Sequence, residues 1–404
     1  MDEPLKGIRV LEWGAFHAGP GGCAILGDLG AEVIKIEQPL VGDPMREMAS
    51  FGYSIFGLPG GKNLFFEAAN RNKKSVTIDL QQEEGRKIAY RLASKSDIFV
   101  TNFRKKAVDD CKMSYPALIQ YNPRLIYLSV SAYGSKGPDS SQGGFDFQGQ
   151  ARSGMMFALG EPDMPPLLAH FGIIDQLTSI MVSHAVITAL LVRERSGTGQ
   201  KLEVSLLGSA LYMQYINVLT GLLLKKDVAR HQRSDTYPLR NYYKCRDEKW
   251  LCIAFPAHWE KKWPVFCRVI GHSQLKDDPK FNSFEKRFEN SREMITMLDS
   301  IFATKTREEW LEIFKQNDLI SCAINSNLEL VDDPQIMEND YIVDHDDPFL
   351  GKIKIPGFPV RFEKNSVKTK SLGPTLGKHT TEVLKNLGSY DDKEIDQFKK
   401  HGII

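Results

Sequence analysis

Residues 7–37 decide the fold class, and they read GIRVLEWGAFHAGPGGCAILGDLGAEVIKIE. Their apolar residues predict one strand from Gly7 to Trp13 and a second strand from Ala31 to Glu37. Between the two strands, Pro20 to Leu29 has the pattern of a helix, with a proline in its first turn and Gly30 as its C-terminal stop. Strand, helix and strand in this order predict a βαβ unit with parallel strands.

The same alternation continues downstream. We expect a further helix at Gln82–Ser94 and strands at Ser75–Leu80, Asp97–Val100, Leu125–Val130, Leu202–Leu206, Lys352–Pro356 and Phe358–Phe362. The pattern favours an α/β fold with a parallel sheet. Residues 133–166 are rich in Gly, Ser and Pro and predict a long loop, and such loops in compact domains are usually functional.

The character of the sequence changes near residue 225. Asn241–Phe255 has the pattern of a β-hairpin, and Thr306 opens a helix with a capping box. We therefore expect a large domain that begins with residues 1–224, a smaller α+β domain at 225–330, and a C-terminal segment at 331–404 that returns to the large domain.

Composition limits the classes of partner. Lys plus Arg number 52 and Asp plus Glu number 51, so the whole chain offers no electrostatic footprint for nucleic acid. The six cysteines show no metal-ligand spacing, so we expect reduced thiols and no metal site. The first residues, MDEPLKGIRV, lack the pattern of a signal peptide, and we expect a cytoplasmic protein.

Two segments carry no Asp, Glu, Lys or Arg, namely Gln176–Val192 and Leu206–Leu224. The second is long enough to span a bilayer. Its polar residues, Ser209, Gln214 and Asn217 among them, would be costly in lipid. We expect two helices that are buried on most sides, in a core or a subunit interface, and no membrane span.

A dinucleotide fingerprint is one alternative for the first helix. Gly19, Gly21 and Ala24 fit the pattern G-x-G-x-x-A of nicotinamide and flavin sites, which would make the protein an NAD-dependent oxidoreductase. However, residues 14–18 separate these glycines from the strand, and Pro20 removes one N–H group that would bind a pyrophosphate. We favour a strand-loop-helix edge that places small residues beside another ligand.

Seven blocks of sequence, in one order along nearly the whole chain, carry a more specific signal. They are FHAGPGGCAILGDLGAEVIKIEQPLVGDPMR (16–46), NRNKKSVTIDL (70–80), SDIFVTNFR (96–104), NPRLIYLSVSAYGSKGP (122–138), FDFQGQARSG (145–154), LLVRERSGTGQKLEVSLL (190–207) and PTLGKHTTEVLKNLG (374–388). Together they resemble the class III CoA-transferase family of the formyl-CoA transferase and carnitine CoA-transferase type. The resemblance implies a Rossmann-like large domain and an interlocked homodimer.

Four blocks resemble one branch of that family, the phenyllactate and 2-hydroxyisocaproate CoA-transferases of amino-acid-fermenting anaerobes. They are AANRNKKSVTIDL (68–80), TNFRKKAV (101–108), QARSG (150–154) and KTREEWLEIF (305–314). The resemblance implies an acyl-CoA as donor and a small 2-hydroxy or aryl-substituted carboxylic acid as acceptor. It implies no permanently bound cofactor, since the coenzyme A thioester is a co-substrate.

Asp175 is the candidate catalytic residue. It is the only carboxylate between Asp163 and Glu194, and it opens an otherwise uncharged helix. From the residues alone, such a carboxylate either stabilises the helix N-terminus or is a working group kept despite the cost of burial. In the family this position holds the nucleophile, so the resemblance implies an aspartyl anhydride and then an aspartyl-CoA thioester.

The resemblance also implies residues that contact coenzyme A. They are His17, Ala18, Gln38, Arg71, Lys74, Asn102, Phe103 and Arg104. Gln38 stands where formyl-CoA transferase has an arginine, and Asp110 stands where many members have another, for which Arg104 or Lys112 would compensate. The basic run at Arg71–Lys74 is either a 3′-phosphate contact or a solvated loop.

Two alternatives stay close to this family. Acyl-CoA racemases of the same superfamily pair an aspartate with a histidine in a GHD motif, which reads Gly144–Phe145–Asp146 here. Phe145 in place of the histidine argues against a racemase. The second alternative is a non-catalytic subunit of a heteromeric transferase, and the presence of Asp175 argues against it.

Overall fold

The computed structural model describes residues 2–51, 54–256 and 260–404, which form two compact units. Unit 1 comprises Met1–Phe157, Leu168–Asp227 and Asn339–Ile404, and unit 2 comprises Ala158–Leu167 and Val228–Glu338. Each unit has a hydrophobic core of its own. Unit 2 thus includes Ala158–Leu167, which we had placed in the large domain, and it extends to Glu338 rather than to residue 330.

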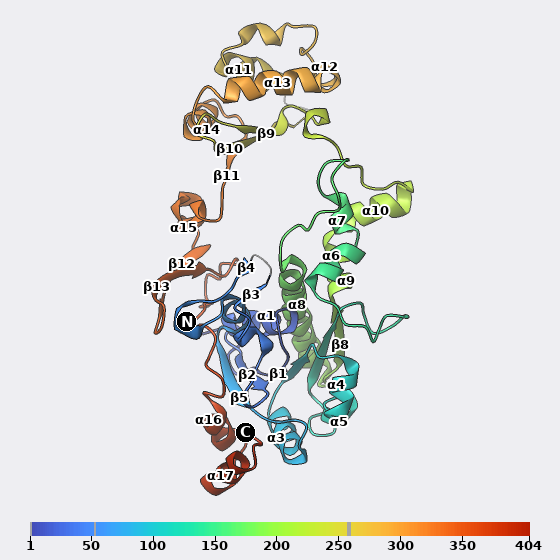
Figure 1. Cartoon of the computed structure of the whole chain (residues 1–404), viewed down its shortest axis with the longest axis vertical. Helices are drawn as coiled ribbons and strands as arrows, with labels where there is room; N and C mark the ends of the chain where they lie inside the picture. The colour runs from blue at the N-terminus through green and yellow to red at the C-terminus, as the bar shows by residue number, and fades with distance from the viewer. Residues whose placement is uncertain (1, 52–53, 257–259) are drawn as a thin grey trace. The chain divides into compact units, whose positions relative to one another are not determined.

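Unit 1 is built on a parallel six-stranded sheet (Figure 1). Its strands in chain order are β1 (Arg9–Trp13), β2 (Glu32–Glu37), β5 (Lys73–Thr77), β6 (Ile98–Thr101), β7 (Ile126–Ser131) and β8 (Lys201–Ser205). Across the sheet the order is β5-β2-β1-β6-β7-β8. The chain therefore builds outward from β1 in one direction and from β6 in the other, and the direction changes between these two strands.

Helices flank this sheet. The helices of unit 1 are α1 (Ala18–Asp28), α2 (Leu64–Asn70), α3 (Glu83–Ser94), α4 (Lys105–Asp110), α5 (Tyr115–Leu118), α6 (Asp146–Arg152), α7 (Met155–Ala158), α8 (Ile173–Ser196), α9 (Leu206–Met213), α10 (Tyr215–Leu224), α16 (Thr380–Asn386) and α17 (Asp392–Lys400). Residues of α3, α5, α16 and α17 pack on strand side chains such as Leu11, Ile34 and Phe99 in one core cluster. Helices α1 and α8 contact each other and also contact strands of the sheet. Their residues do not belong to that cluster.

Glycines allow α1 and α8 to approach closely. A side-chain carbon built at Gly21 would lie 2.4 Å from Ser179 Oγ, and one built at Gly22 would lie 2.4 Å from Val182 Cγ1. Gly21, the second glycine of the dinucleotide-like pattern, is therefore used in helix packing. The pattern reflects the contact between two helices rather than a surface left open for a pyrophosphate.

Three local predictions need correction. Residues 133–166 contain α6 and α7 rather than a continuous loop, because Gln148 Oε1 accepts the Phe145 N–H at 3.0 Å and completes the start of α6. Residues 206–224 form two helices bent by 78°, since the Gln214 side chain turns back to Ser153 at the break. Phe358–Phe362 is not a strand, because Pro359 cannot donate to a ladder.

The remaining strands of unit 1 form two small sheets. They are β3 (Ser50–Phe51) with β4 (Ser54–Ile55), and β12 (Ile342–Asp347) with β13 (Gly351–Pro356). The second pair confirms the strand expected at Lys352–Pro356, whose partner β12 was not predicted. The sequence of β12, IVDHDD, has too many polar residues to be predicted as a strand.

Unit 2 is a three-stranded antiparallel sheet packed against helices. Its strands are β9 (Arg240–Lys244), β10 (Trp250–Ala254) and β11 (Ser321–Ile324), in the order β11-β10-β9. Its helices are α11 (Trp263–Val269), α12 (Phe284–Glu289), α13 (Ser291–Phe302), α14 (Arg307–Gln316) and α15 (Pro334–Glu338). The predicted hairpin and the capping box at Thr306 are both confirmed.

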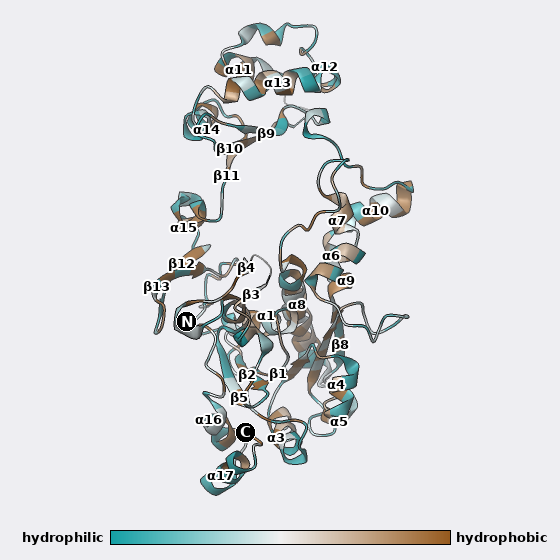
Figure 2. Cartoon of the chain, viewed as in Figure 1, coloured by the Kyte–Doolittle hydropathy of each residue, from teal (hydrophilic) through white to brown (hydrophobic). Residues whose placement is uncertain are grey.

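The uncharged helices differ in burial. By length and composition α8 is apolar enough to cross a membrane, as is the bent pair α9 and α10, and 44% of the relevant stretch of α8 is buried. No residue of α10 is buried within the single chain, so α10 is not a core helix, and its burial in a subunit interface stays a prediction. Figure 2 shows brown, hydrophobic residues along these helices, and Ile216 on α10 is 79% exposed.

Candidate functional site

The candidate site lies at the carboxyl ends of β1 and β6, where the strand order changes direction. Asn102, just after β6, binds the loop after β1 through Ala15: its Nδ2 donates to the Ala15 carbonyl at 2.7 Å, and its Oδ1 accepts the Ala15 N–H at 3.0 Å. Open parallel α/β sheets bind their ligands at this kind of crossover. The loop after β1 therefore has a fixed position at the expected place for a ligand.

A buried cluster of charged residues holds the loop after β1 and the first turn of α1 in place. Lys35 donates to the Gly14 carbonyl and to Glu12, both at 2.8 Å, and Lys73 donates to the Pro20 carbonyl at 2.8 Å and pairs with Glu12 at 2.5 Å. Although burial opposes the charge on Lys35, Glu12 and other carboxylates raise its pKa. Sequence analysis missed this cluster, and its signal is the presence of charged residues in the middle of strands that are otherwise apolar.

The residue before His17 is strained. Phe16 has φ of 62°, an unusual value for a bulky side chain. Its N–H donates to Asp43 Oδ1 at 3.3 Å, and Asp43 Oδ2 pairs with Lys35 at 3.0 Å. The ion cluster therefore helps to hold a backbone conformation that is seen mainly at functional sites.

His17 links the start of α1 to the start of α8. It is buried, and its Nε2 lies 2.8 Å from Oε1 of Gln176, the residue after Asp175. Burial lowers the pKa of His17, so its imidazole is neutral at pH 7. Because an amide oxygen only accepts, the proton lies on Nε2 and Nδ1 is an acceptor, and Nδ1 has no hydrogen-bond partner within the described part of the chain.

Ala18 is also in contact with α8. Ser179 Oγ donates to the Ala18 carbonyl at 3.0 Å and lies 2.9 Å from the Asp175 carbonyl. The predicted site residues His17 and Ala18 thus contact Gln176 and Ser179, which follow Asp175 on α8 within about one helical turn.

Asp175 is the third residue of α8, and its carboxylate is uncommitted. The helix begins after Gly172, a left-handed residue with φ of 76° and no capping side chain. Among residues 2–51, 54–256 and 260–404, no hydrogen bond or ion pair is found for the half-buried Asp175 carboxylate. Burial, with a smaller contribution from Asp146, raises the pKa of Asp175 to about 7.

Asp146 supplies the cap that Gly172 lacks. Its Oδ1 accepts the N–H groups of Ile174 at 2.7 Å and Asp175 at 3.2 Å, the two donors that a capping side chain normally satisfies. Gln150 Nε2 donates to Asp146 Oδ2 at 2.7 Å and so orients it. Sequence analysis named Asp146 only as part of a motif, and a glycine at the cap position is the signal that the cap comes from elsewhere.

Aromatic rings surround this helix start. The Phe65 ring centroid lies 5.1 Å from that of His17 and 5.6 Å from that of Phe171. Phe145, 57% exposed, lies edge-on to Phe16 at 5.5 Å. The ring of Phe65 thus connects His17, at the start of α1, with Phe171, which lies shortly before α8.

Two of the remaining predicted CoA residues lie near the same loops. The Phe103 ring lies 4.6 Å from Trp13, so this pair joins the ends of β6 and β1. The Arg104 guanidinium lies against the backbone of Gly143, where a side-chain carbon would be 2.0 Å from Nη2. Arg104 is exposed, as is Gln38 after β2.

Arg71 and Lys74 have carboxylate partners. Arg71 binds Asp28 through Nε and Nη2, the latter at 2.6 Å. Lys74 bridges Glu32 at 3.0 Å and Glu382 at 2.8 Å. Arg71 and Lys74 are therefore both paired with carboxylates in this structure. The basic run at Arg71–Lys74 is not a solvated loop, because Lys73 and Lys74 belong to β5.

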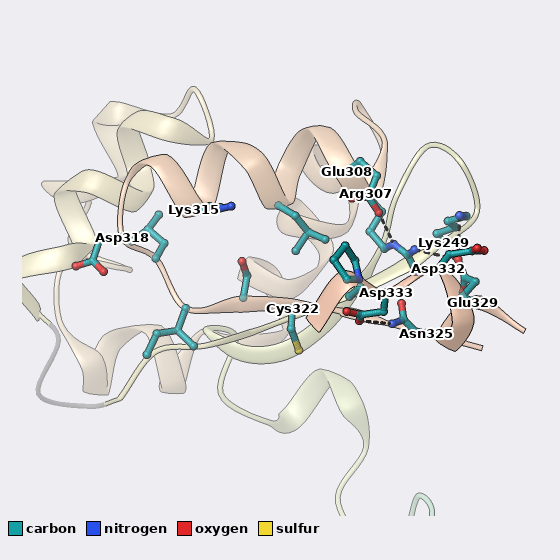
Figure 3. A pocket seen from close by; sticks show the side chains of 16 residues that line it. Lys249, Arg307, Glu308, Lys315, Asp318, Cys322, Asn325, Glu329, Asp332 and Asp333 are labelled. Atoms are coloured by element: carbon teal, nitrogen blue, oxygen red, sulfur yellow. Dashed lines mark hydrogen bonds and ion pairs between the residues drawn. The ribbon is translucent and has the colours of Figure 1, made fainter. Parts of the chain in front are cut away.

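A cavity of about 730 Å³ lies within unit 2, whereas Asp175 belongs to unit 1 (Figure 3). It is lined by both polar and apolar side chains, and the ion pair Arg307–Glu329, 2.9 Å apart, is part of the lining. Within the described residues, no group of three or more His, Cys, Asp or Glu is arranged to hold a metal ion.

Comparison with known proteins identifies relatives along the whole chain. The model of CoA-transferase family III matches residues 5–380. The (R)-2-hydroxy-4-methylpentanoate CoA-transferase of Clostridioides difficile is 31% identical, over 99% of both chains. The cinnamoyl-CoA:phenyllactate CoA-transferase of Clostridium sporogenes is 30% identical, over 98% of this chain and 96% of the relative. A CAIB/BAIF family protein from Brucella suis has a crystal structure with a TM-score of 0.86, at 26% identity over 96% of this chain and 100% of that one.

Proposed function

The chain belongs to CoA-transferase family III, and from that premise we propose that it moves CoA from an acyl-CoA donor to a free carboxylic acid with Asp175 as the nucleophile. One observation carries the proposal. Asp175 has an uncommitted, half-buried carboxylate at the start of α8, while another aspartate caps that helix. A carboxylate needed only for structure would be hydrogen-bonded.

The chemistry begins with attack on the donor thioester. A carboxylate oxygen of Asp175 attacks the thioester carbon, the CoA thiolate leaves, and a mixed anhydride forms. The thiolate then attacks the Asp175 carbonyl carbon, which releases the donor acid and leaves an aspartyl-CoA thioester. The acceptor carboxylate attacks this thioester and forms a second anhydride, from which CoA recaptures the acceptor acyl group and frees Asp175.

The surroundings of Asp175 suit these steps. A desolvated carboxylate is a stronger nucleophile than a hydrated one, and burial is the main cause of the raised pKa of Asp175. Neutral His17 fixes Gln176, the residue after Asp175, through its Nε2, and its buried Nδ1 has no partner among the described residues. The raised pKa keeps about half of Asp175 ionised near pH 7.

The acceptor that we propose is a 2-hydroxy or aryl-substituted acid. Two relatives with nearly complete coverage carry such acids in their names, 2-hydroxy-4-methylpentanoate and phenyllactate. Small changes in a pocket alter specificity readily, so the acceptor class is tested separately from the reaction. By the same resemblance, His17, Ala18, Asn102, Phe103 and Arg104 are the proposed CoA contacts, and Gln38, Arg71 and Lys74 would have to leave their present surroundings to join them.

The assembly that we propose is a homodimer in the cytoplasm, with the six-stranded sheet as a Rossmann-like core. Exposed apolar side chains on α8 and α10 support the dimer, among them Ile187, Leu191, Ile216 and Leu223. A soluble monomer seldom leaves so many apolar residues of neighbouring helices uncovered. Light scattering of the pure protein is expected to give twice the chain mass.

The test of function is a transfer assay with pure protein. Acetyl-CoA or cinnamoyl-CoA is mixed with single acids from a panel that includes phenyllactate, 2-hydroxy-4-methylpentanoate, succinate and glutarate, and new thioesters are measured by mass spectrometry. We expect new CoA thioesters, with the highest kcat/KM for a 2-hydroxy or aryl acid. Absence of every new thioester would contradict the transferase.

The same samples separate the alternatives. Deuterium incorporation at the α-carbon of an acyl-CoA without CoA transfer would indicate a racemase. Binding of NAD without binding of acyl-CoA would indicate an oxidoreductase. Transfer that appears only after a second protein is added would indicate one subunit of a heteromeric enzyme.

A further inference from the structure

Two cysteines face each other on neighbouring strands of unit 2. Cys252 on β10 is paired directly with Cys322 on β11 in the antiparallel register. Opposite residues of antiparallel strands have Cα atoms about 4.5–5.5 Å apart, and disulfides span about 4.4–6.8 Å. The backbone therefore holds these two residues at a separation that a disulfide accepts without movement of the strands.

The pair lies on the open face of the sheet. Leu251 and Ile253, the neighbours of Cys252 on β10, are buried in the core of unit 2, so the alternation of the strand turns Cys252 the other way. Cys322 is exposed and Cys252 is half-buried. A small oxidant in solution therefore has access to at least one of the two sulfurs.

The two sulfurs already touch. Their Sγ atoms lie 3.1 Å apart and share a hydrogen bond. This hydrogen bond, with burial as a smaller cause, raises the pKa of Cys322 to about 11. Each sulfur therefore lies within reach of the other, so a mixed disulfide formed on either cysteine can be resolved by its neighbour.

We propose that Cys252 and Cys322 form a reversible disulfide, which joins β11 to β10 when a small-molecule disulfide such as oxidised glutathione is present. One cysteine of the pair, as its thiolate, attacks one sulfur of the oxidant and releases one thiol. The other cysteine, after losing its proton, attacks the protein sulfur of the mixed disulfide and releases the second thiol. Two electrons pass from the protein to the oxidant, and the two protons go to the released thiols.

The disulfide would link the edge strand β11 of the sheet in unit 2 covalently to β10. Within the described residues, strand β11 pairs only with β10, and Cys322 also lines the cavity beside α14 (Figure 3). The two cysteines are separated by 70 positions along the chain, which encloses most of unit 2 in one covalent loop. Closing a loop of this length restricts the unfolded state strongly. The inference concerns unit 2 alone and does not depend on the transferase mechanism.

The experiment uses the full-length protein with oxidised glutathione, followed by intact-mass measurement and peptide mapping. We expect the loss of two hydrogen atoms per chain, a peptide that links Cys252 to Cys322, and reversal by dithiothreitol. The oxidised protein is expected to show a higher Tm for unit 2, by about 5 °C or more.

Single variants distinguish this pair from ordinary thiol oxidation. In C252S and in C322S the remaining thiol has no partner, so a glutathione adduct is expected to persist instead of an internal disulfide. C111S, which removes a half-buried cysteine of unit 1, is the matched control and is expected to behave as the wild type. Stable glutathione adducts on the wild type, or an internal disulfide that survives in C252S or C322S, would overturn the proposal.

Discussion

The first turns of α6 and α8 each carry an aspartate, and the two aspartates have opposite surroundings. Asp146, at the start of α6, is committed to two backbone N–H groups and to Gln150. Asp175, in the first turn of α8, has a pKa of about 7 and no partner in the described structure. One carboxylate completes the start of α8, and the other, our proposed nucleophile, keeps its oxygens free of hydrogen bonds within the described structure.

This difference teaches how a reactive carboxylate is kept in place. A carboxylate at a helix start normally satisfies the free N–H groups itself. Here Gly172 occupies the cap position and Asp146 supplies the acceptor from another helix, so the backbone around Asp175 is fixed without the use of its side chain. The following predictions test that separation of positioning from reaction.

The largest effect is expected from D175N. The amide keeps the shape of the side chain and removes the nucleophile, so turnover should fall by at least about a thousandfold. Steady-state transfer assays measure the loss, with circular dichroism as the check on folding. A D175N protein with more than a tenth of wild-type turnover would remove the distinction between the two aspartates.

A smaller effect on rate and a clear effect on stability are expected from D146A. Without this cap the Ile174 and Asp175 N–H groups lose their acceptor, so the free energy of unfolding should fall by about 2 kcal/mol. The displaced helix start should lower kcat by roughly 10–100-fold. D146N, which retains Oδ1 as an acceptor, should lose less stability and should lower the pKa of Asp175, since a nearby like charge is removed.

Asp139 provides the control for that variant. It is a half-buried residue in an ion pair with Arg152, the last residue of α6, and it does not cap the start of α8. D139A should change the free energy of unfolding by less than about 0.5 kcal/mol. Equal effects of D139A and D146A would show that Asp146 has no special positioning role.

D175N should also stabilise the protein at neutral pH. The folded pKa of Asp175 is raised from 3.8 to about 7, so the native state holds a proton that the unfolded state has lost, and stability falls as pH rises from about 4 to about 7. D175N lacks this penalty. Urea unfolding should therefore give a gain over wild type of roughly 1–3 kcal/mol at pH 8, which declines towards pH 4. A gain that does not depend on pH would argue against the raised pKa.

The smallest effect is expected from S179A, for which S183A is the control. The two variants compare a hydrogen bond from α8 to the start of α1 with a hydrogen bond within α8. S179A removes a hydroxyl that donates to the Ala18 carbonyl, whereas S183A, one turn further along α8, removes one that donates to Ile180 of the same helix. S179A should cost about 1 kcal/mol and raise KM for acyl-CoA, since the loop at Ala18 is a proposed CoA contact. S183A should leave KM unchanged, and a shift in KM with both variants would contradict the assignment.

The fold was largely predictable because its signals are local. Apolar runs, the proline and glycine around the first helix, and the capping box at Thr306 each depend on a few neighbouring residues. The position of Asp175 in the first turn of α8 was predictable from its place before an uncharged helix, whereas its role as nucleophile stays a prediction. By contrast, the role of Asp146, the burial of Lys35 and Lys73 and the pairing of Arg71 with Asp28 depend on residues far apart in sequence. The exposure of α10 could not be predicted either, because the sequence does not tell a core helix from an interface helix.

The most direct test of the central claim is intact-mass measurement of the protein after incubation with an acyl-CoA and no acceptor. We predict a CoA thioester or an acyl adduct that maps to Asp175 by peptide sequencing, is released by hydroxylamine, and is absent from D175N but present in D146N. An adduct on another residue, or an adduct that persists in D175N, would contradict the assignment of Asp175 as the nucleophile.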